Sequence, residues 1–247
     1  MTDDKGMVAG EPHYIREYRR MISSLRKRSA NEEEVMERAV GGAYEKTGAV
    51  QAALIDELIP ERPIHIIDVG CGSGRLAYAL RGQKRIAYSG FDIMADLVEY
   101  AKSKCGRSDW RLETISTLQL PVPNACADMV VFMSVFTHLK PGEIKIYIKE
   151  ALRVLKPGGL VVASYLDPNE PRHTKGWLPA PLQLLARLLG RDVMLTRTSQ
   201  KMLAEWLTDG GFVIERAIDD GSFGQHVLIA SKSGGQIATA DGSSYEN

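Results

Sequence analysis

The sequence predicts an α/β fold, namely a doubly wound, mostly parallel seven-stranded sheet with an antiparallel last strand, N-terminal helices and a lid insertion between strands 5 and 6. Short apolar runs alternate with stretches of helical periodicity along the chain. A glycine-rich turn follows the first apolar run. In addition, 44% of the 247 residues are hydrophobic, which is enough for one large core.

Two helical patterns precede the first predicted strand. Residues 14–25 carry apolar side chains at helical spacing with arginines between them, which indicates an amphipathic helix with a solvated basic face. A second pattern covers residues 44–59 and ends at Pro60, which has no N–H to continue a helix. We therefore expect residues 1–59 to form an N-terminal helical segment that packs on the core.

The hydrophobic period then changes from helical to strand-like. Strands are predicted at residues 64–69, 86–91, 110–114, 129–133, 160–165, 212–218 and 226–231, with helices at 75–80, 97–103, 144–155 and 201–207. Crossovers between the first five strands imply parallel pairing, and the last two strands would close the sheet. We expect the ligand-binding domain to span residues 60–232, including a lid or substrate insertion at 167–198. The polar residues 233–247 are expected to form a mobile tail.

Composition gives expectations about partners and compartment. The 31 basic and 31 acidic residues balance, so no overall field attracts the chain to nucleic acid. Three cysteines without a C-x-x-C pair fit a reducing compartment, and no apolar run reaches the ~18 residues of a membrane helix. No H-E-x-x-H or similar cluster is present. We expect a cytoplasmic location, no membrane span and no metal.

The strongest local signal is the turn that runs from Asp68 through Gly70, Cys71, Gly72 and Gly74. Glycines at such a turn let the backbone approach a ligand at the carboxyl edge of the sheet. A dinucleotide site would have a further glycine where Arg75 stands. The Asp68 carboxylate would repel a pyrophosphate, but it suits a ligand with an ammonium and a sulfonium, such as S-adenosylmethionine (SAM).

A second carboxylate closes the next strand. Asp92 follows Gly72 by 92 − 72 = 20 residues, where an acidic side chain can accept hydrogen bonds from both ribose hydroxyls. Alternatively, Asp92 caps the following helix. The two roles are compatible.

Four segments together resemble class I SAM-dependent methyltransferases in order and spacing over residues 40–231. They are Asp68 to Gly74, Gly90-Phe91-Asp92, Asp128-Met129-Val130-Val131 and Leu155-Lys156-Pro157-Gly158-Gly159. The resemblance implies that Gly70, Cys71 and Gly72 hold the methionine end of SAM, that Asp92 and Ile93 hold the ribose, and that the stretch near Ile115 frames the adenine. Many members carry an Asp after strand three that accepts a hydrogen bond from the adenine amino group. This chain has Thr114 there, so Glu113, Thr114 or a backbone carbonyl would be the acceptor. Tyr44 resembles an N-terminal aromatic residue that closes over SAM.

The segment from Met133 to Leu139 is similar to one in family members that act on small molecules and sugar-containing lipids. Within it we expect Ser134 to contact the cofactor and His138 to act as a general base toward a substrate hydroxyl. Alternatively, His138 only caps or packs near the next helix. In the insertion, Leu182, Leu185 and Leu189 share one helical face. That face either packs on the domain or meets a hydrophobic substrate, a second subunit or a membrane surface.

The resemblance implies O-methylation of a small-molecule or glycan/lipid-type acceptor, with S-adenosylhomocysteine as product. The alternatives are an N- or C-methyltransferase on the same fold, a non-catalytic SAM-binding partner subunit, and a dinucleotide oxidoreductase. A nucleic-acid substrate is disfavoured, because the motifs typical of such enzymes are missing after strand four and no basic stripe is evident. A homodimer is left open.

Overall fold

The structure, a computed structural model, describes residues 12–173, 181–182, 184–185, 189, 195–219 and 221–234. Parts of the expected lid insertion, including Leu188, and the expected mobile tail beyond residue 234 lie outside the described residues.

The described strands form one seven-stranded sheet in the order β3-β2-β1-β4-β5-β7-β6. The strands are β1 (Ile64–Val69), β2 (Ile86–Asp92), β3 (Arg111–Thr114), β4 (Ala127–Phe132), β5 (Leu155–Tyr165), β6 (Phe212–Ile218) and β7 (His226–Lys232). Pairing is parallel from β3 to β5, whereas β7 is antiparallel to both β5 and β6. The predicted fold class, including the antiparallel last strand, is confirmed.

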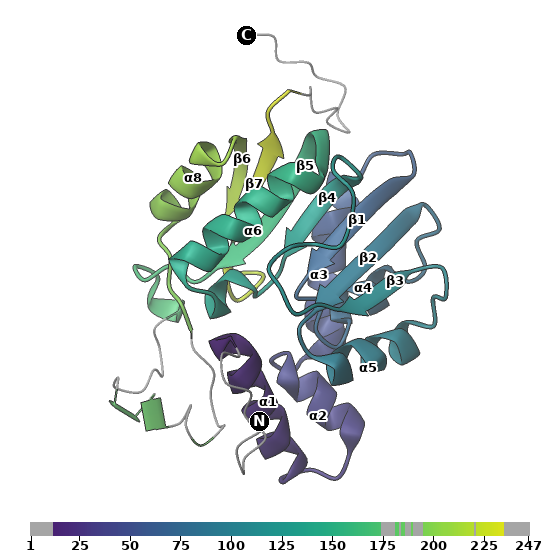
Figure 1. Cartoon of the computed structure of the whole chain (residues 1–247), viewed down its shortest axis with the longest axis vertical. Coiled ribbons are helices and arrows are strands. Elements are labelled where there is room, and N and C mark those ends of the chain that lie inside the picture. Colours follow the sequence, from purple (N-terminus) through teal and green to yellow (C-terminus); the bar gives the residue numbers. More distant parts are fainter. Residues whose placement is uncertain are drawn as a thin grey trace.

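Helices cover both faces of the sheet and its carboxyl edge (Figure 1). The described helices are α1 (His13–Arg26), α2 (Glu32–Ala39), α3 (Tyr44–Leu58), α4 (Arg75–Leu80), α5 (Ala95–Cys105), α6 (Pro141–Val154) and α8 (Gln200–Asp209), with short 3-10 turns η1 (Phe136–His138) and η2 (Pro171–His173). Helices α3, α4 and α5 pack on one face and α6 and α8 on the other. None of these helices is both long and apolar enough to cross a membrane.

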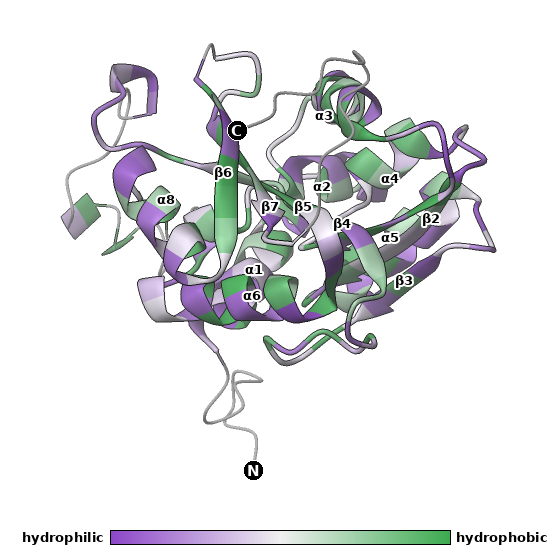
Figure 2. Ribbon diagram, turned by 90° about the horizontal axis from the view of Figure 1, so that it is seen from above, coloured by the Kyte–Doolittle hydropathy of each residue, from purple (hydrophilic) through white to green (hydrophobic). Residues whose placement is uncertain are grey.

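Alternate side chains of the central strands enter two different cores. Along β1, Ile64 and Ile66 pack in the cluster with the α3–α5 helices, while Ile67 and Val69 pack in the cluster with α6 and α8. This alternation follows from the two-residue period of a strand. A sheet that is apolar on both faces must be covered on both faces, which explains the doubly wound arrangement. Apolar residues accordingly follow the central strands, and the helices carry both residue kinds (Figure 2).

Three helices, not two, precede β1. The additional helix is α2, which the sequence prediction missed because its eight residues begin with three glutamates that look like solvated loop. The Asn31 side chain caps it by accepting a hydrogen bond from the Glu34 N–H at 3.3 Å. The glutamates in the first turn also interact favourably with the helix dipole. Its buried side, which includes Val35 and Met36, packs in a small cluster with α1 and the start of α5.

The boundary between α6 and β5 also differs from the prediction. The helical pattern suggested that the helix runs to residue 155 and that the strand begins at 160, but β5 begins at Leu155 directly after α6. Leu155 pairs with Ala127, and the pairing shifts register before Leu160 pairs with Met129. The Pro-Gly-Gly stretch sits in this irregular part of the strand, which is why the apolar pattern begins only at Leu160.

Candidate functional site

A cavity of about 430 Å³ lies at the carboxyl edge of the sheet, between the strand ends and helices α1 to α3. Its size falls within the range of roughly 300–1,000 Å³ that is typical of small-molecule sites. Nine of the residues singled out from the sequence line it: Asp68, Gly70, Cys71, Gly72, Asp92, Ile93, Ile115, Ser134 and His138. The parallel register, which pairs Asp68 with Gly90 and Val69 with Phe91, brings the ends of β1 and β2 together at this edge.

The backbone amides of the glycine turn are already used within the protein. The N–H groups of Gly70 and Cys71 donate to the Phe91 carbonyl at 2.7 and 3.1 Å, and the Gly74 N–H donates to the Cys71 carbonyl at 2.9 Å. The Gly72 N–H donates to Asp92 Oδ2 at 2.8 Å. A turn that binds an anion presents free N–H groups to it. These four amides are not free, so this turn is poorly suited to a pyrophosphate.

Asp92 organises the site with both carboxylate oxygens. Its Oδ2 accepts from Gly72, and its Oδ1 accepts from the Met94 N–H at 2.9 Å, at the start of α5. Asp92 therefore supports the helix start as well as the glycine turn. Each oxygen keeps a further lone pair for a ligand donor. Burial raises the pKa of Asp92, and the Met94 and Gly72 amides oppose that rise.

Asp68 is a second buried carboxylate, with 2% of its surface exposed. It accepts a hydrogen bond from the Tyr88 hydroxyl. Burial raises the pKa of Asp68 to about 7, and the negative charge of Asp92 adds to the rise, whereas the Tyr88 hydrogen bond and the Arg75 charge oppose it. A cation bound next to Asp68 would favour the ionised form and lower this pKa again.

Glycine is required at two positions of the turn because other elements approach it closely. Gly70 and Gly72 have φ angles of +69° and +55°, in the left-handed region. A Cβ atom on Gly72 would lie 2.6 Å from Val40 Cγ1, and one on Gly70 would lie 2.5 Å from Val135 Cγ2. The absence of these side chains lets the end of α2 and the segment after β4 close over the turn.

Two residues expected to contact the cofactor, Tyr44 and Gly74, are not among those that line the cavity. Tyr44 begins α3, is 2% exposed, and its hydroxyl donates to the Ser73 carbonyl at 2.7 Å. Gly74 precedes α4, and a Cβ there would lie 2.6 Å from the Cβ of Ala101 on α5. Both residues support the glycine turn from outside the cavity, because the start of each helix packs against other helices.

Replacing Tyr44 with Phe tests this assignment. The variant loses the hydrogen bond to the Ser73 carbonyl but keeps the ring, so we expect the free energy of unfolding to fall by about 1 kcal/mol. SAM affinity should change by no more than about twofold, since a supporting hydrogen bond is not a ligand contact. Denaturant unfolding and calorimetric titration measure the two quantities. A large loss of affinity with unchanged stability would return Tyr44 to the ligand site.

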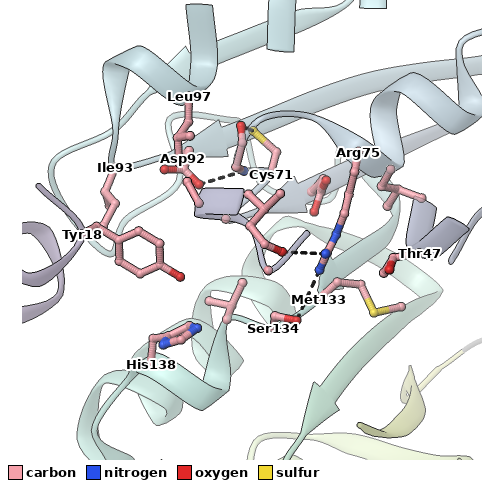
Figure 3. A pocket seen from close by; sticks show the side chains of 18 of the residues that line it. Tyr18, Thr47, Cys71, Arg75, Asp92, Ile93, Leu97, Met133, Ser134 and His138 are labelled. Atoms are coloured by element: carbon pink, nitrogen blue, oxygen red, sulfur yellow. Dashed lines mark hydrogen bonds between the residues drawn. The ribbon is translucent and has the colours of Figure 1, made fainter. Parts of the chain in front are cut away.

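Aromatic side chains of α1 do reach the cavity from the N-terminal segment, among them Tyr18. Its ring contacts the His138 ring edge-on, with 5.4 Å between centroids (Figure 3). Burial and the nearby Asp92 charge raise the pKa of Tyr18. Tyr14 and Met21 of the same helix also line the cavity. From the sequence, Tyr18 is simply one apolar position of an amphipathic helix, so its role in the site was not predicted.

Ser134 occupies a strained backbone position directly after β4. Its φ is +62°, which is uncommon for a residue other than glycine. Its N–H donates to Ser164 Oγ at 2.7 Å, and Gln225 Nε2 donates to its Oγ at 3.0 Å. Ser164 in turn donates to Gln225 Oε1 at 2.7 Å. This network links the segment after β4 to Ser164 of β5 and to Gln225, directly before β7, and it fixes the segment that carries Ser134 and His138.

Within the described ranges, no group of three or more His, Cys, Asp or Glu side chains could hold a metal ion. The charged groups that line the cavity are Asp68, Asp92, Arg38 and Arg75. The cavity therefore combines two buried acids with two arginines, and it suits a ligand that carries both signs of charge.

Comparison with known proteins agrees with this geometry. A family model described as a methyltransferase domain matches residues 66–159. The chain is similar to the demethylmenaquinone methyltransferase of Tropheryma whipplei, with 28% identity over 147 residues that cover 57% of this chain and 59% of that protein. It is also similar to the ubiquinone biosynthesis O-methyltransferase of Idiomarina loihiensis, with 26% identity and coverage of 62% and 70%. The crystal structure of a SAM-dependent methyltransferase from Methanosarcina mazei superposes with a TM-score of 0.56 at 21% identity, covering 73% of this chain and 97% of that one.

Proposed function

Because the chain belongs to the class I SAM-dependent methyltransferases, we propose that it transfers the methyl group of SAM to a hydroxyl oxygen of a small-molecule or glycan-bearing acceptor. The observation that carries the proposal is the pair of buried carboxylates, Asp68 and Asp92. They lie beside a glycine turn in which the amides of Gly70, Cys71, Gly72 and Gly74 already donate hydrogen bonds within the protein. The similarity to a protein named as an O-methyltransferase supports oxygen as the acceptor atom.

The residues present fit SAM along the length of the cavity. Ile93, Leu97 and Ile115 offer an apolar surface for the adenine. The free lone pairs of Asp92 suit the ribose hydroxyls, and the Asp68 carboxylate suits the ammonium group. SAM supplies a methyl group on a positively charged sulfur when it is bound. This assignment of ligand ends rests on the charge and polarity of the lining residues.

His138 would accept a proton from the acceptor, and the walls of the cavity would align the reacting groups. An imidazole nitrogen of His138 would accept the proton of the acceptor hydroxyl as the oxygen gains the methyl group. Tyr18 packs against that imidazole and limits its movement. Alignment of the reacting atoms by a closed cavity can supply a large part of the rate for such a transfer. No metal is proposed for the reaction.

Calorimetric titration with SAM, S-adenosylhomocysteine and NADH in parallel tests the donor assignment. We expect micromolar binding of the first two ligands and none of NADH. Methyl transfer to a panel of hydroxyl, amine and carbon acceptors, followed by mass and NMR analysis of products, then separates O-methylation from N- or C-methylation. Binding without transfer to any acceptor class would favour a non-catalytic SAM-binding subunit. If neither SAM nor S-adenosylhomocysteine binds, the proposal is overturned.

SAM affinity should depend on pH through Asp68. Because the pKa of Asp68 is raised to about 7, the carboxyl becomes protonated as the pH falls through 7 and no longer attracts the ammonium group. At pH 6 about one tenth of the molecules carry the ionised form, so the apparent dissociation constant should be about tenfold higher than at pH 8. Titrations between pH 6 and 8 measure this.

The Asp68→Asn variant serves as the control. It keeps the shape of the side chain but has no titrating group at position 68. The ligand still titrates, and Asp92 keeps its raised pKa. We expect weaker binding with a flatter pH dependence. If the variant and the unaltered protein show the same pH dependence, Asp68 is not the group responsible.

A further inference from the structure

We propose that Gln225 is a positioning residue for methyl transfer, because its side-chain amide holds Ser134 in the left-handed conformation from which the chain enters η1. This inference rests on the proposed function. Gln225 directly precedes β7 and lines the cavity, and it belongs to no motif predicted from the sequence. Its partner Ser134 lies 91 residues away along the chain.

The chain leaves the sheet at the carboxyl end of β4. Pairing of β4 with β5 ends at Phe132 and Ala163. Two residues further on, Ser134 has a φ of +62°, a value that a side chain other than glycine keeps only when its surroundings impose it. The Thr137 hydroxyl donates to the Ser134 carbonyl at 2.9 Å, so η1 is attached to the peptide group that this conformation orients. The direction of η1, and with it the place of His138, therefore depends on Ser134.

Gln225 supplies the surroundings that impose this conformation. Its Nε2 donates to Ser134 Oγ at 3.0 Å, and its Oε1 accepts from Ser164 Oγ at 2.7 Å. Ser164 Oγ in turn accepts from the Ser134 N–H at 2.7 Å. The network is thus closed, and it binds both the main chain and the side chain of Ser134. A side-chain amide suits this place because it donates and accepts at the same time.

The sheet fixes the place of Gln225. Strand β7 runs antiparallel to β5, and its first residue, His226, pairs with Tyr165 at the end of β5. Gln225 is therefore held beside Ser164, the residue before Tyr165. Ser164 is 2% exposed, so its hydrogen bonds are shielded from water and are correspondingly strong. Ser134 and His138 lie on the same side of the cavity (Figure 3), so support given to the first also restrains the second.

A direct contact with the acceptor is the alternative role for Gln225, since it lines the cavity together with Phe223 and Gly224. Its Nε2 and Oε1 already have partners in Ser134 and Ser164, which favours support over contact. The two roles predict different results. A contact with the acceptor acts whatever residue stands at position 134, whereas support of a strained conformation matters only while that residue is strained.

A double-mutant cycle with Ser134→Gly tests the inference, because glycine adopts a positive φ without support. Gln225→Met removes both hydrogen bonds and keeps the length of the side chain. Alone, it should reduce the turnover number at saturating SAM at least about tenfold, since a small displacement of the reacting groups is costly. Affinity for S-adenosylhomocysteine should change by no more than about threefold, because the loss falls on the transition state and not on cofactor binding. In the Ser134→Gly background, the same replacement should reduce turnover by less than about threefold.

Gln200→Leu is the matched control. Gln200 Oε1 accepts from the Tyr165 hydroxyl at 3.2 Å, and Gln200 is not among the residues that line the cavity. The turnover number of this variant should stay within about twofold of that of the unaltered protein. Thermal unfolding of the four proteins of the cycle measures the same coupling without an acceptor, and Gln225→Met should lower the midpoint less in the Ser134→Gly background.

Equal losses from Gln225→Met in both backgrounds, in turnover or in the unfolding midpoint, would overturn the inference. A loss confined to the KM for the acceptor would also overturn it and would assign Gln225 to acceptor contact. Should Gln225→Met not fold, Ser164→Ala takes its place, because it opens the same network and should show the same dependence on residue 134. If the unaltered protein binds neither SAM nor S-adenosylhomocysteine, the proposed function itself fails, which is distinct from an uncoupled cycle in an active protein.

Discussion

Replacing Asp92 with Ala is expected to raise the dissociation constant of SAM about 10- to 160-fold, which corresponds to a loss of about 1.5 to 3 kcal/mol. The carboxylate is 7% exposed and accepts from the amides of Gly72 and Met94. Its removal leaves the ribose hydroxyls without a charged acceptor. It also removes the hydrogen bond from the Gly72 amide that supports the glycine turn. The measurement is calorimetric titration of the folded variant with SAM, after thermal unfolding has shown that the fold persists.

Two further variants separate the ligand contact from the support of the turn. Asp92→Asn keeps one carbonyl oxygen for the backbone amides but loses the charge, so we expect a smaller loss of affinity than for Asp92→Ala. Asp96→Ala removes a nearby carboxylate of α5 that pairs with Arg26 at 2.7 Å and is half exposed. It should leave SAM affinity unchanged. Unaltered affinity in Asp92→Ala would remove Asp92 from the ligand site.

The carboxyl edge of the sheet was predictable because its chemistry is local in sequence. Asp68 lies near the end of β1, the glycine turn directly follows that strand, and Asp92 ends β2. Parallel strands that are neighbours in the sheet bring such ends together without any further information. The resemblance to the methyltransferase family placed Ile93, Ile115, Ser134 and His138 at the same site, and all four line the cavity.

The residues that the prediction missed come from helices whose packing is not encoded in a local pattern. The hydrophobic period identifies α1 as amphipathic, but it does not say that Tyr18 faces a ligand site. The chain turns between α2 and α3 through Gly41, Gly42 and Ala43, all with positive φ, and this turn sets where α1 and α2 lie. A tyrosine was expected to approach the site, but the structure places Tyr18 there and Tyr44 behind the turn.

Polar side chains on helices are a second group of site residues that the sequence pattern does not reveal. Thr47, Gln51 and Arg75 would ordinarily be assigned to solvated surfaces, since such residues are usually exposed. The structure shows that these three residues line the cavity, and the close approach of Gly48 to the Arg75 carbonyl oxygen sets α3 against the start of α4. In this chain the lining residues that follow strand ends were predicted from sequence, whereas those carried by α3 and by the start of α4 depend on tertiary packing.

The N-terminal segment thus completes the site instead of flanking it. Helix α1 packs through Tyr14 and Ile15 into the core on the α6 side of the sheet, and through Ile22 into the cluster with α2 and α5. Tyr18 lies between these two anchors and contacts His138. His138 is therefore held by η1 from one side and by α1 from the other, which is the kind of restraint that a general base needs.

Replacing His138 with Ala is expected to reduce the turnover number roughly 100-fold or more, with SAM affinity largely kept, because the proposed base acts on the acceptor hydroxyl and not on the donor. The turnover number is measured at saturating SAM with an acceptor found by the panel screen. Because the pKa of Asp68 is raised to about 7, saturating SAM is needed to separate the effect of Asp68 on binding from the effect of His138 on turnover.

Tyr18→Leu distinguishes proton transfer from packing at this position. If His138 only packs, removing its aromatic neighbour should change turnover about as much as removing the imidazole, and both losses should be a few fold. If His138 is the base, Tyr18→Leu should reduce turnover less than His138→Ala does, because the imidazole is still present. A loss of only a few fold in His138→Ala would leave alignment by the cavity walls as the source of rate.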